Sequence, residues 1–198
     1  MLPPLDQFRA NIGQVRAVVA IAESLDSQTT AAIDVNDIYR AALVLSVSAL
    51  DHYVHEKTLA GMIEVAQGGR PMTDSFRRFR IGLSALGPEL HAPPTVWLEQ
   101  EVRRAHSLLT FQRADAIGDA MRLIHATPLW PDVAAVLQRD ARDVKDSLDL
   151  IVDRRNKIAH EADCEPNGLS IKWPISSSLV AYAIDYLVSL VTAIDAVV

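Results

Sequence analysis

The alternation of apolar and polar positions along the chain predicts a succession of helices. Apolar residues recur at helical spacing from about Leu5 to Leu25, and a second, longer helix is expected from Asn36 to about Ala66. Asn36 suits an N-cap, and the glycine pair 68–69 suits the end of this helix. Its middle, residues 41–50, is apolar on all sides apart from two serines. That pattern is typical of a central helix or of one running through a subunit interface.

Prolines and glycines divide the middle of the chain into shorter elements. Thr73 or Asp74 is expected to cap a short helix, and Thr95 to cap a helix that runs to about Phe111. Residues 113–125 are expected to continue as helix. The elements in this part of the chain are thus predicted to be short and separated by breaks.

Two long helices are expected near the end of the chain. One starts after residues 127–132, which contain two prolines, and ends near His160. The other is capped by serines 176–178 and runs nearly to the C-terminus, while residues 169–175 form a short extended piece that pairs as a minor hairpin or not at all. The pattern as a whole predicts one all-α domain over residues 1–198, a bundle of about six helices with no internal repeat or linker.

Composition narrows the function classes without selecting one. A net charge of −6 argues against a general nucleic-acid coating protein but leaves room for a local basic site. The single cysteine, Cys164, rules out an intramolecular disulfide and a cysteine-based metal cluster. The N-terminus lacks the pattern of a signal peptide. The apolar stretch from Leu179 onwards contains Asp185 and Asp195, so a buried helix is expected there rather than a membrane span. From these features we expect a cytoplasmic protein that does not bind a membrane.

The most informative stretch is the end of the long helix before residue 160. Asn156 and His160 lie four residues apart and share a helix face, whereas Arg155 points about 140° away from His160, so only its long side chain would let the two converge. Arg155 also continues the apolar stripe between Ile151 and Ile158. There it needs an anion, an acidic partner or a subunit boundary. A plainer interpretation is a helix C-terminus whose cations complement the helix dipole.

The full string favours the more specific interpretation. Arg-Asn-Lys-Ile-Ala-His at residues 155–160, with Leu-Asp-Leu-Ile-Val-Asp upstream, resembles the signature helix of the HEPN superfamily (higher eukaryotes and prokaryotes nucleotide-binding), in particular its RiboL-PSP-HEPN branch. The motif of that superfamily is an arginine followed directly by a polar residue, with a histidine a few residues further on. Many relatives carry glycine after the histidine, where this chain has Glu161. Residues 39–51 also resemble the opening helix of this branch.

This resemblance implies a HEPN-like helical bundle and a metal-independent endoribonuclease that cleaves single-stranded RNA by attack of the ribose 2′-OH. His160 would be the general acid or base, and Arg155 would hold the scissile phosphate. Asn156 would orient either the phosphate or the imidazole. The family places such a site between two protomers of a homodimer. No cofactor and no metal is implied. An antitoxin or regulatory protein is a further implied partner, in toxin–antitoxin or defence settings. The alternatives are a non-catalytic HEPN module that binds nucleotides or a partner protein, and a purely structural helical dimer.

Two other clusters carry candidate chemistry. Arginines are interleaved with Phe76 and Phe79, a composition suited to phosphate contacts and base stacking, although such clusters are also common on solvated faces. The candidate RNA contacts are Arg77, Arg78, Arg80 and, on the motif helix, Arg154.

The second cluster combines carboxylates and imidazoles on one helix. Asp51 with His55, and His52 with Glu56, are spaced by four residues, which is a geometry that can hold a divalent metal. The alternative is a helix end that carries its own salt bridges, and this is the interpretation we adopt. The remaining histidines, His91, His106 and His125, have no patterned partner and are expected on the surface or satisfied in the core.

Overall fold

The structure is a computed structural model that describes residues 2–28, 33–82, 93–165 and 171–198. It contains the helices α1 (Pro4–Gln28), α2 (Asn36–Ala66), α3 (Asp74–Arg77), α4 (Pro94–His106), α5 (Ala114–Met121), α6 (Leu129–Leu137), α7 (Ala141–His160) and α8 (Ser177–Val197). The all-α prediction is confirmed. The described residues form eight helices, so the expected number of about six was too low.

One reason for the larger number is a break inside the predicted motif helix. Gln138 adopts a left-handed conformation with φ of 53° and ends α6. The chain then restarts at Asp140, whose side chain accepts a hydrogen bond of 2.7 Å from the backbone N–H of Arg142 and so caps α7. Pro131 lies in the first turn of α6, where its missing N–H has no intrahelical partner to lose. Residues 127–132, which we interpreted as a break, therefore include the start of a helix.

The middle of the chain is also more divided than the pattern suggests. α4 starts at Pro94 and ends at His106, so the predicted cap at Thr95 and the predicted end at Phe111 were wrong. The carboxylate of Asp51 accepts the backbone N–H of Phe111 at 2.6 Å and holds the chain in an irregular path after α4. The helix expected over residues 113–125 is present only as the two turns of α5. An acceptor on a distant helix competed here with helical hydrogen bonding, which a local pattern does not reveal.

Several predicted helix ends are confirmed. Thr73 caps α3 by accepting the N–H of Phe76, and Ser176 caps α8 by accepting the N–H of Leu179. α2 spans the predicted residues and stops before Gly68, whose φ of 79° is accessible to glycine without strain. Asn36 is the first helical residue rather than the cap, and the side chain of Asp34 accepts its N–H at 2.8 Å.

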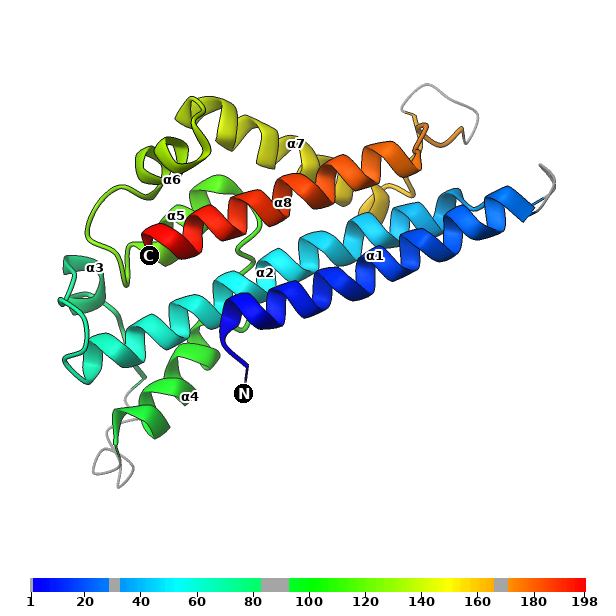
Figure 1. Cartoon of the computed structure of the whole chain (residues 1–198). Helices are drawn as coiled ribbons and strands as arrows, with labels where there is room; N and C mark the ends of the chain where they lie inside the picture. Colours follow the sequence, from blue (N-terminus) through cyan, green and yellow to red (C-terminus); the bar gives the residue numbers. More distant parts are fainter. Residues whose placement is uncertain (1, 29–32, 83–92, 166–170) are drawn as a thin grey trace.

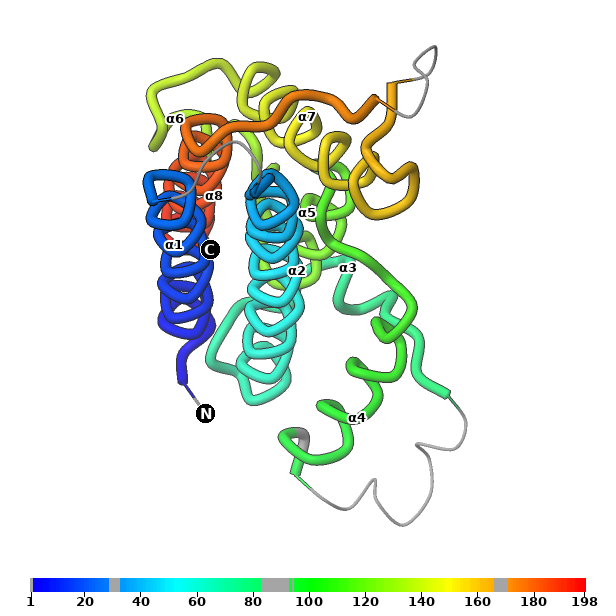
Figure 2. The backbone as a smooth tube through the Cα atoms, turned by 90° about the vertical axis from the view of Figure 1, so that its right-hand side faces the viewer, coloured from blue at the N-terminus to red at the C-terminus, as the bar shows by residue number. Residues whose placement is uncertain are grey.

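Helix α2 is the centre of the fold. It contacts α1, α4, α5, α7 and α8. α1 and α2 form a long antiparallel pair with α8 beside them, and α7 lies across the other side of the bundle (Figures 1 and 2). Helix α2 also packs against the motif helix α7, and the C-terminus of α7 lies near the start of α2 (Figure 1). Large side chains from α2 and α8, including Leu43, Tyr53 and Leu187, are fully buried between the layers.

Helix α8 is the one described helix that is long and apolar enough to cross a membrane by length and composition, with a mean hydropathy of 1.6. Half of that stretch is buried inside the fold. Core helices of soluble proteins satisfy the same criterion, and α8 packs against α1, α2 and α6 as such a helix does.

Candidate active site at the end of helix α7

Helix α7 is held to the bundle by an apolar face and by two carboxylates. Val144, Leu148 and Val152 are buried against the core. Asp149 accepts the backbone N–H of Ala114 at 3.2 Å, and Asp153 pairs with Arg113 in the loop that leads into α5. Asp149 and Asp153, four residues apart on α7, therefore anchor the start of α5 and position the helix that carries the motif.

The arginine and the asparagine of the motif are in contact. Arg155 is partly buried, as expected for its place between Ile151 and Ile158, and its Nη1 donates a hydrogen bond of 3.1 Å to the side-chain oxygen of Asn156. The Nε of Arg155 is buried and has no hydrogen-bond partner among the described residues. Arg155 also forms no ion pair among the described residues, and its side chain is only partly buried, so the rest of the guanidinium is suited to an anion or to a second chain.

His160 is the last residue of α7 and is exposed. No hydrogen bond connects His160 with Arg155 or Asn156 in the described part of the chain. Within one chain, Arg155 and Asn156 are thus in contact, and His160 is bonded to neither of them.

Arg154 has a different environment from its neighbour. Its Nη2 donates to Asp163 Oδ2 at 2.9 Å and to the backbone carbonyls of Trp173 and Pro174. Asp163 is fully buried and also accepts Arg40 Nε at 2.7 Å. Burial lowers the pKa of Arg154, and the carboxylate of Asp163 opposes this effect. The predicted role of Arg154 in RNA contact stays a prediction, and its guanidinium is already bound within the fold.

The ion pairs of Asp163 fold the segment after the motif back onto α2. The backbone N–H of Trp173 donates to the carbonyl of Asp163 at 2.8 Å, and Cys164 and Lys172 form an antiparallel bridge. The extended piece expected at 169–175 thus pairs as a minor hairpin in its described part, residues 171–175; residues 169 and 170 lie outside the described ranges. Sequence reasoning did not single out Asp163, Arg40 or Trp173, because their partners are far apart in the chain.

The basic cluster around α3 is separate from the motif. α3 lies at one end of the molecule and the C-terminus of α7 at the other (Figure 1). Arg77 pairs with Asp74, and Arg78 and Arg80 are exposed. Phe76 and Phe79 are partly buried against the core. Arg77, Arg78 and Arg80 therefore do not adjoin the motif within one chain, and contact with RNA stays a prediction for all three.

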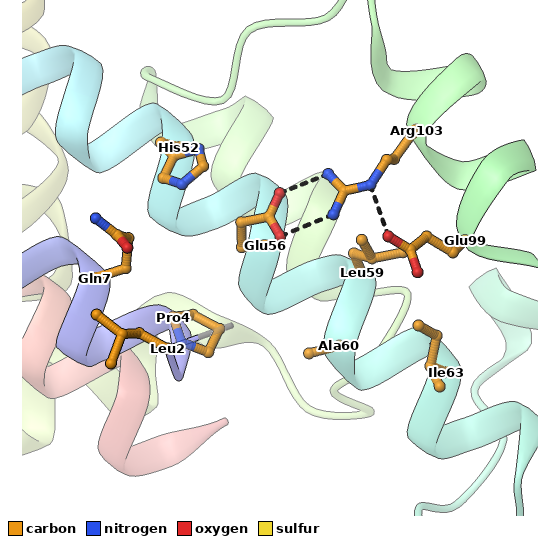
Figure 3. A pocket seen from close by; sticks show the side chains of 10 residues that line it. All are labelled: Leu2, Pro4, Gln7, His52, Glu56, Leu59, Ala60, Ile63, Glu99 and Arg103. Atoms are coloured by element: carbon orange, nitrogen blue, oxygen red, sulfur yellow. Dashed lines mark hydrogen bonds and ion pairs between the residues drawn. The ribbon is translucent and has the colours of Figure 1, made fainter. Parts of the chain in front are cut away.

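The carboxylate–imidazole cluster on α2 borders a cavity of about 760 Å³ between α1, α2 and α4 (Figure 3). Glu56 and Arg103 form a bidentate ion pair in its wall, with distances of 2.7 and 3.1 Å. The Arg103 guanidinium lowers the pKa of the Glu56 carboxyl. Both oxygens of Glu56 are thereby used, and no group of three or more potential metal ligands occurs in the described ranges. The cluster links α2 to α4. Of the two expected pairs, His55 and Asp51 lie 3.7 Å apart, within ion-pair distance, whereas no hydrogen bond joins His52 to Glu56 in the described residues.

The other unassigned histidines are satisfied inside the fold where the structure describes them. His106 is buried among the rings of His55, Phe79 and Phe111. His125 lies within hydrogen-bond distance of Thr127 and Asp132. His91 lies outside the described residues.

Comparisons of the chain with protein-family models, with curated proteins and with solved structures find no match. The residues at the end of α7, and the motif that they resemble, are therefore the basis for inferring a function.

Proposed function

We propose that this protein is a metal-independent endoribonuclease that cleaves single-stranded RNA. RNA carries its own nucleophile, the ribose 2′-OH, so the protein needs to position the phosphate, move protons and neutralise charge. Arg155 would bind the scissile phosphate through two N–H groups, and more strongly as charge builds up in the transition state. His160 would transfer the proton, since an imidazole can do so near neutral pH. The products would be a 2′,3′-cyclic phosphate and a 5′-hydroxyl.

The observation that carries this proposal is the guanidinium of Arg155, which pairs with no carboxylate among the described residues. Its Nη1 is held by Asn156, and the side chain is only partly buried. The next residue, Arg154, shares with Arg155 a buried Nε that has no acceptor among the described residues, but its Nη2 is bound by the carboxylate of Asp163 and by two carbonyls. A phosphate would supply the negative charge that Arg155 lacks, and Asn156 would then act as a positioning residue for the guanidinium.

The proposed site is shared between two chains of a homodimer. Within one chain His160 is not hydrogen-bonded to Arg155. A two-fold axis near the C-terminus of α7 would bring two copies of each residue into one cleft. The setting that we propose is a cytoplasmic toxin or defence effector, with an antitoxin or regulatory protein as the partner that restrains it.

The direct test incubates the purified protein with single-stranded RNA in excess chelator. We expect cutting by the wild type, and a loss of about 10²–10⁴-fold in His160→Ala, the usual effect of removing a positioned acid–base group. Arg155→Lys should also be poor, because an ammonium lacks the planar fork of donors. Arg142→Lys is the matched control, since Arg142 is exposed on the same helix and pairs with Asp146.

The second candidate function is a non-catalytic module that binds a nucleotide or a protein. The negative net charge and the pairing of Arg77, Arg113 and Arg154 with carboxylates favour it, because fewer free cations remain for RNA. Absence of cutting by the folded wild type, in vitro and on expression in growing cells, would select this function. Cutting that persists in His160→Ala would place the activity elsewhere.

A further inference from the structure

The segment after the motif helix holds one tryptophan in a fixed position. The backbone N–H of Trp173 donates to the backbone carbonyl of Asp163 at 2.8 Å, and the carbonyl of Trp173 accepts Arg40 Nη2 at 2.8 Å and Arg154 Nη2 at 3.1 Å. Asp163 is fully buried between the same two arginines. Two cations and a carboxylate thus fix the backbone at Trp173 relative to both α2 and α7.

The indole lies beside a lysine of the motif helix that forms no ion pair with any residue that the structure describes. The Nζ of Lys157 is 5.6 Å from the centroid of the Trp173 ring, within the range of a cation–π contact. Lys157 is exposed and Trp173 is partly exposed. Lys157 precedes His160 by three residues, so the two side chains are neighbours on the helix surface. An aromatic face and a cation therefore lie next to the proposed general acid–base group.

These two side chains match the two parts of a nucleotide. A base has a flat face that stacks on an aromatic ring, and the adjoining phosphate pairs with an ammonium group. We propose that Trp173 and Lys157 form a base-stacking subsite for the nucleotide next to the scissile phosphate. The subsite rests on the proposed function, because it presumes that single-stranded RNA reaches His160.

Rigidity is the feature that distinguishes this tryptophan from an ordinary surface aromatic residue. A stacking platform loses little conformational freedom on binding when its backbone is already fixed. The backbone at Trp173 is fixed by two guanidinium groups, which are themselves held by the buried carboxylate of Asp163. Stacking is tolerant of base identity, so the subsite would favour unpaired RNA over duplex without reading a particular sequence.

The test measures binding separately from cutting. The probe is a short, single-stranded, fully 2′-O-methylated oligonucleotide, which lacks the attacking hydroxyl. Trp97→Phe and Trp130→Phe are combined so that Trp173 is the remaining tryptophan of the three in the chain. We expect the probe to quench the fluorescence of Trp173. In the chain that keeps Trp97 and Trp130, Trp173→Leu should raise the Kd, measured by the anisotropy of the same probe with a fluorescent label, by about 5-fold to 150-fold, which corresponds to the usual contribution of one stacked base.

Two further variants separate stacking from a structural effect. Trp173→Phe keeps an aromatic face and should retain most of the affinity, with circular dichroism as a check that each variant is folded. Lys157→Gln should reduce the slope of log K against log salt concentration by about 0.7, the value for one phosphate contact on a single strand. Trp130→Phe alone is the matched control, since its indole donates to the carbonyl of Ala114, between α5 and α6.

The outcomes distinguish this subsite from the ribonuclease activity. Quenching and the loss in Trp173→Leu, without cutting of unmodified RNA, would keep the subsite and overturn the proposed reaction. Cutting with an unchanged kcat/KM and an unchanged Kd in Trp173→Leu would overturn the subsite alone. Absence of any change in Trp173 fluorescence at saturating probe would also overturn it.

Discussion

Removing the charge of Asp163 should destabilise this protein more than removing any exposed carboxylate. Asp163 is fully buried and accepts hydrogen bonds from Arg40 and Arg154, whose side chains are 8% and 19% exposed. Its other oxygen, Oδ1, has no partner among the described residues. In Asp163→Asn the amide oxygen can still accept both arginines, and the amide nitrogen replaces an oxygen that accepts nothing. The substitution therefore removes the charge with little change in shape.

The expected loss is about 3 kcal/mol, at the lower end of the range for breaking a buried ion pair by removing one partner. For a chain of this size that corresponds to a fall in Tm of about 6–12 °C. Asp163→Ala should cost a further ~1 kcal/mol or more, because Asp163 has a φ of 60°, and an alanine tolerates the left-handed region less well than asparagine does. The segment that carries Trp173 should loosen in both variants.

The assay is urea unfolding followed by circular dichroism, with Asp185→Asn as the matched control. Asp185 also pairs with one arginine, Arg16, at 2.6 Å, but its side chain is 65% exposed. Exposed pairs contribute about 0–1 kcal/mol, so the control should lose less than that. Equal, small decreases in the free energy of unfolding of Asp163→Asn and Asp185→Asn would refute this expectation. Burial would then make no difference to how much the carboxylate stabilises the fold.

Three further predictions concern the motif and the core histidine. Arg155→Met should leave the free energy of unfolding within about 1 kcal/mol of wild type or raise it, because it removes a buried unpaired N–H. The same substitution should abolish cutting of RNA. Equilibrium unfolding checks the first expectation and the nuclease assay the second. Burial, with His55 nearby, lowers the pKa of His106 to about 4. The neutral imidazole therefore contributes its full stabilisation above the unfolded pKa of 6.5, and the free energy of unfolding should fall by up to about 3 kcal/mol as the pH falls from 6.5 towards 4. His106→Phe, which keeps the aromatic contacts, should remove that part of the pH dependence in urea titrations. Light scattering at micromolar concentration should give a dimer, and a monomer would contradict the shared site of Arg155 and His160.

The long elements of the fold were predictable from the sequence because their signals are local. The apolar periodicity of α1, the bounds of α2 and the caps at Thr73 and Ser176 all lie within a few residues of the structure they specify. Breaks that depend on distant partners were missed. The end of α4 depends on Asp51, sixty residues before Phe111, whose N–H it accepts. No window along the chain contains both groups, so periodicity alone extended the helix too far.

The candidate site was predictable to the same degree. The spacing of Arg155, Asn156 and His160 placed Arg155 on the packed side of α7, and the structure shows it partly buried there. The spacing did not reveal that Asn156 holds Arg155, since neighbours in sequence point about 100° apart on a helix and meet only through a long side chain. Asp163 and Trp173 could not be found from the sequence, because each acts through contacts with α2 that the hairpin creates.

The two adjacent arginines at the end of α7 have different partners because neighbouring residues on a helix point in different directions. A rotation of about 100° directs Arg154 towards the hairpin, where Asp163 and two carbonyls bind its Nη2, and directs Arg155 towards a face where Asn156 accepts its Nη1 and no carboxylate pairs with it among the described residues. The Nε of each guanidinium is buried without an acceptor there, so the two arginines differ in their ion pairing. A fold that needed only cations at this helix end could pair both with carboxylates, since the chain carries more acidic than basic residues. Leaving a partly buried guanidinium without a counter-charge costs stability and is retained most readily where an anion or a second chain supplies that charge. Arg155 is therefore the residue at which stability and the proposed function are expected to conflict, and Arg154 the one at which they coincide.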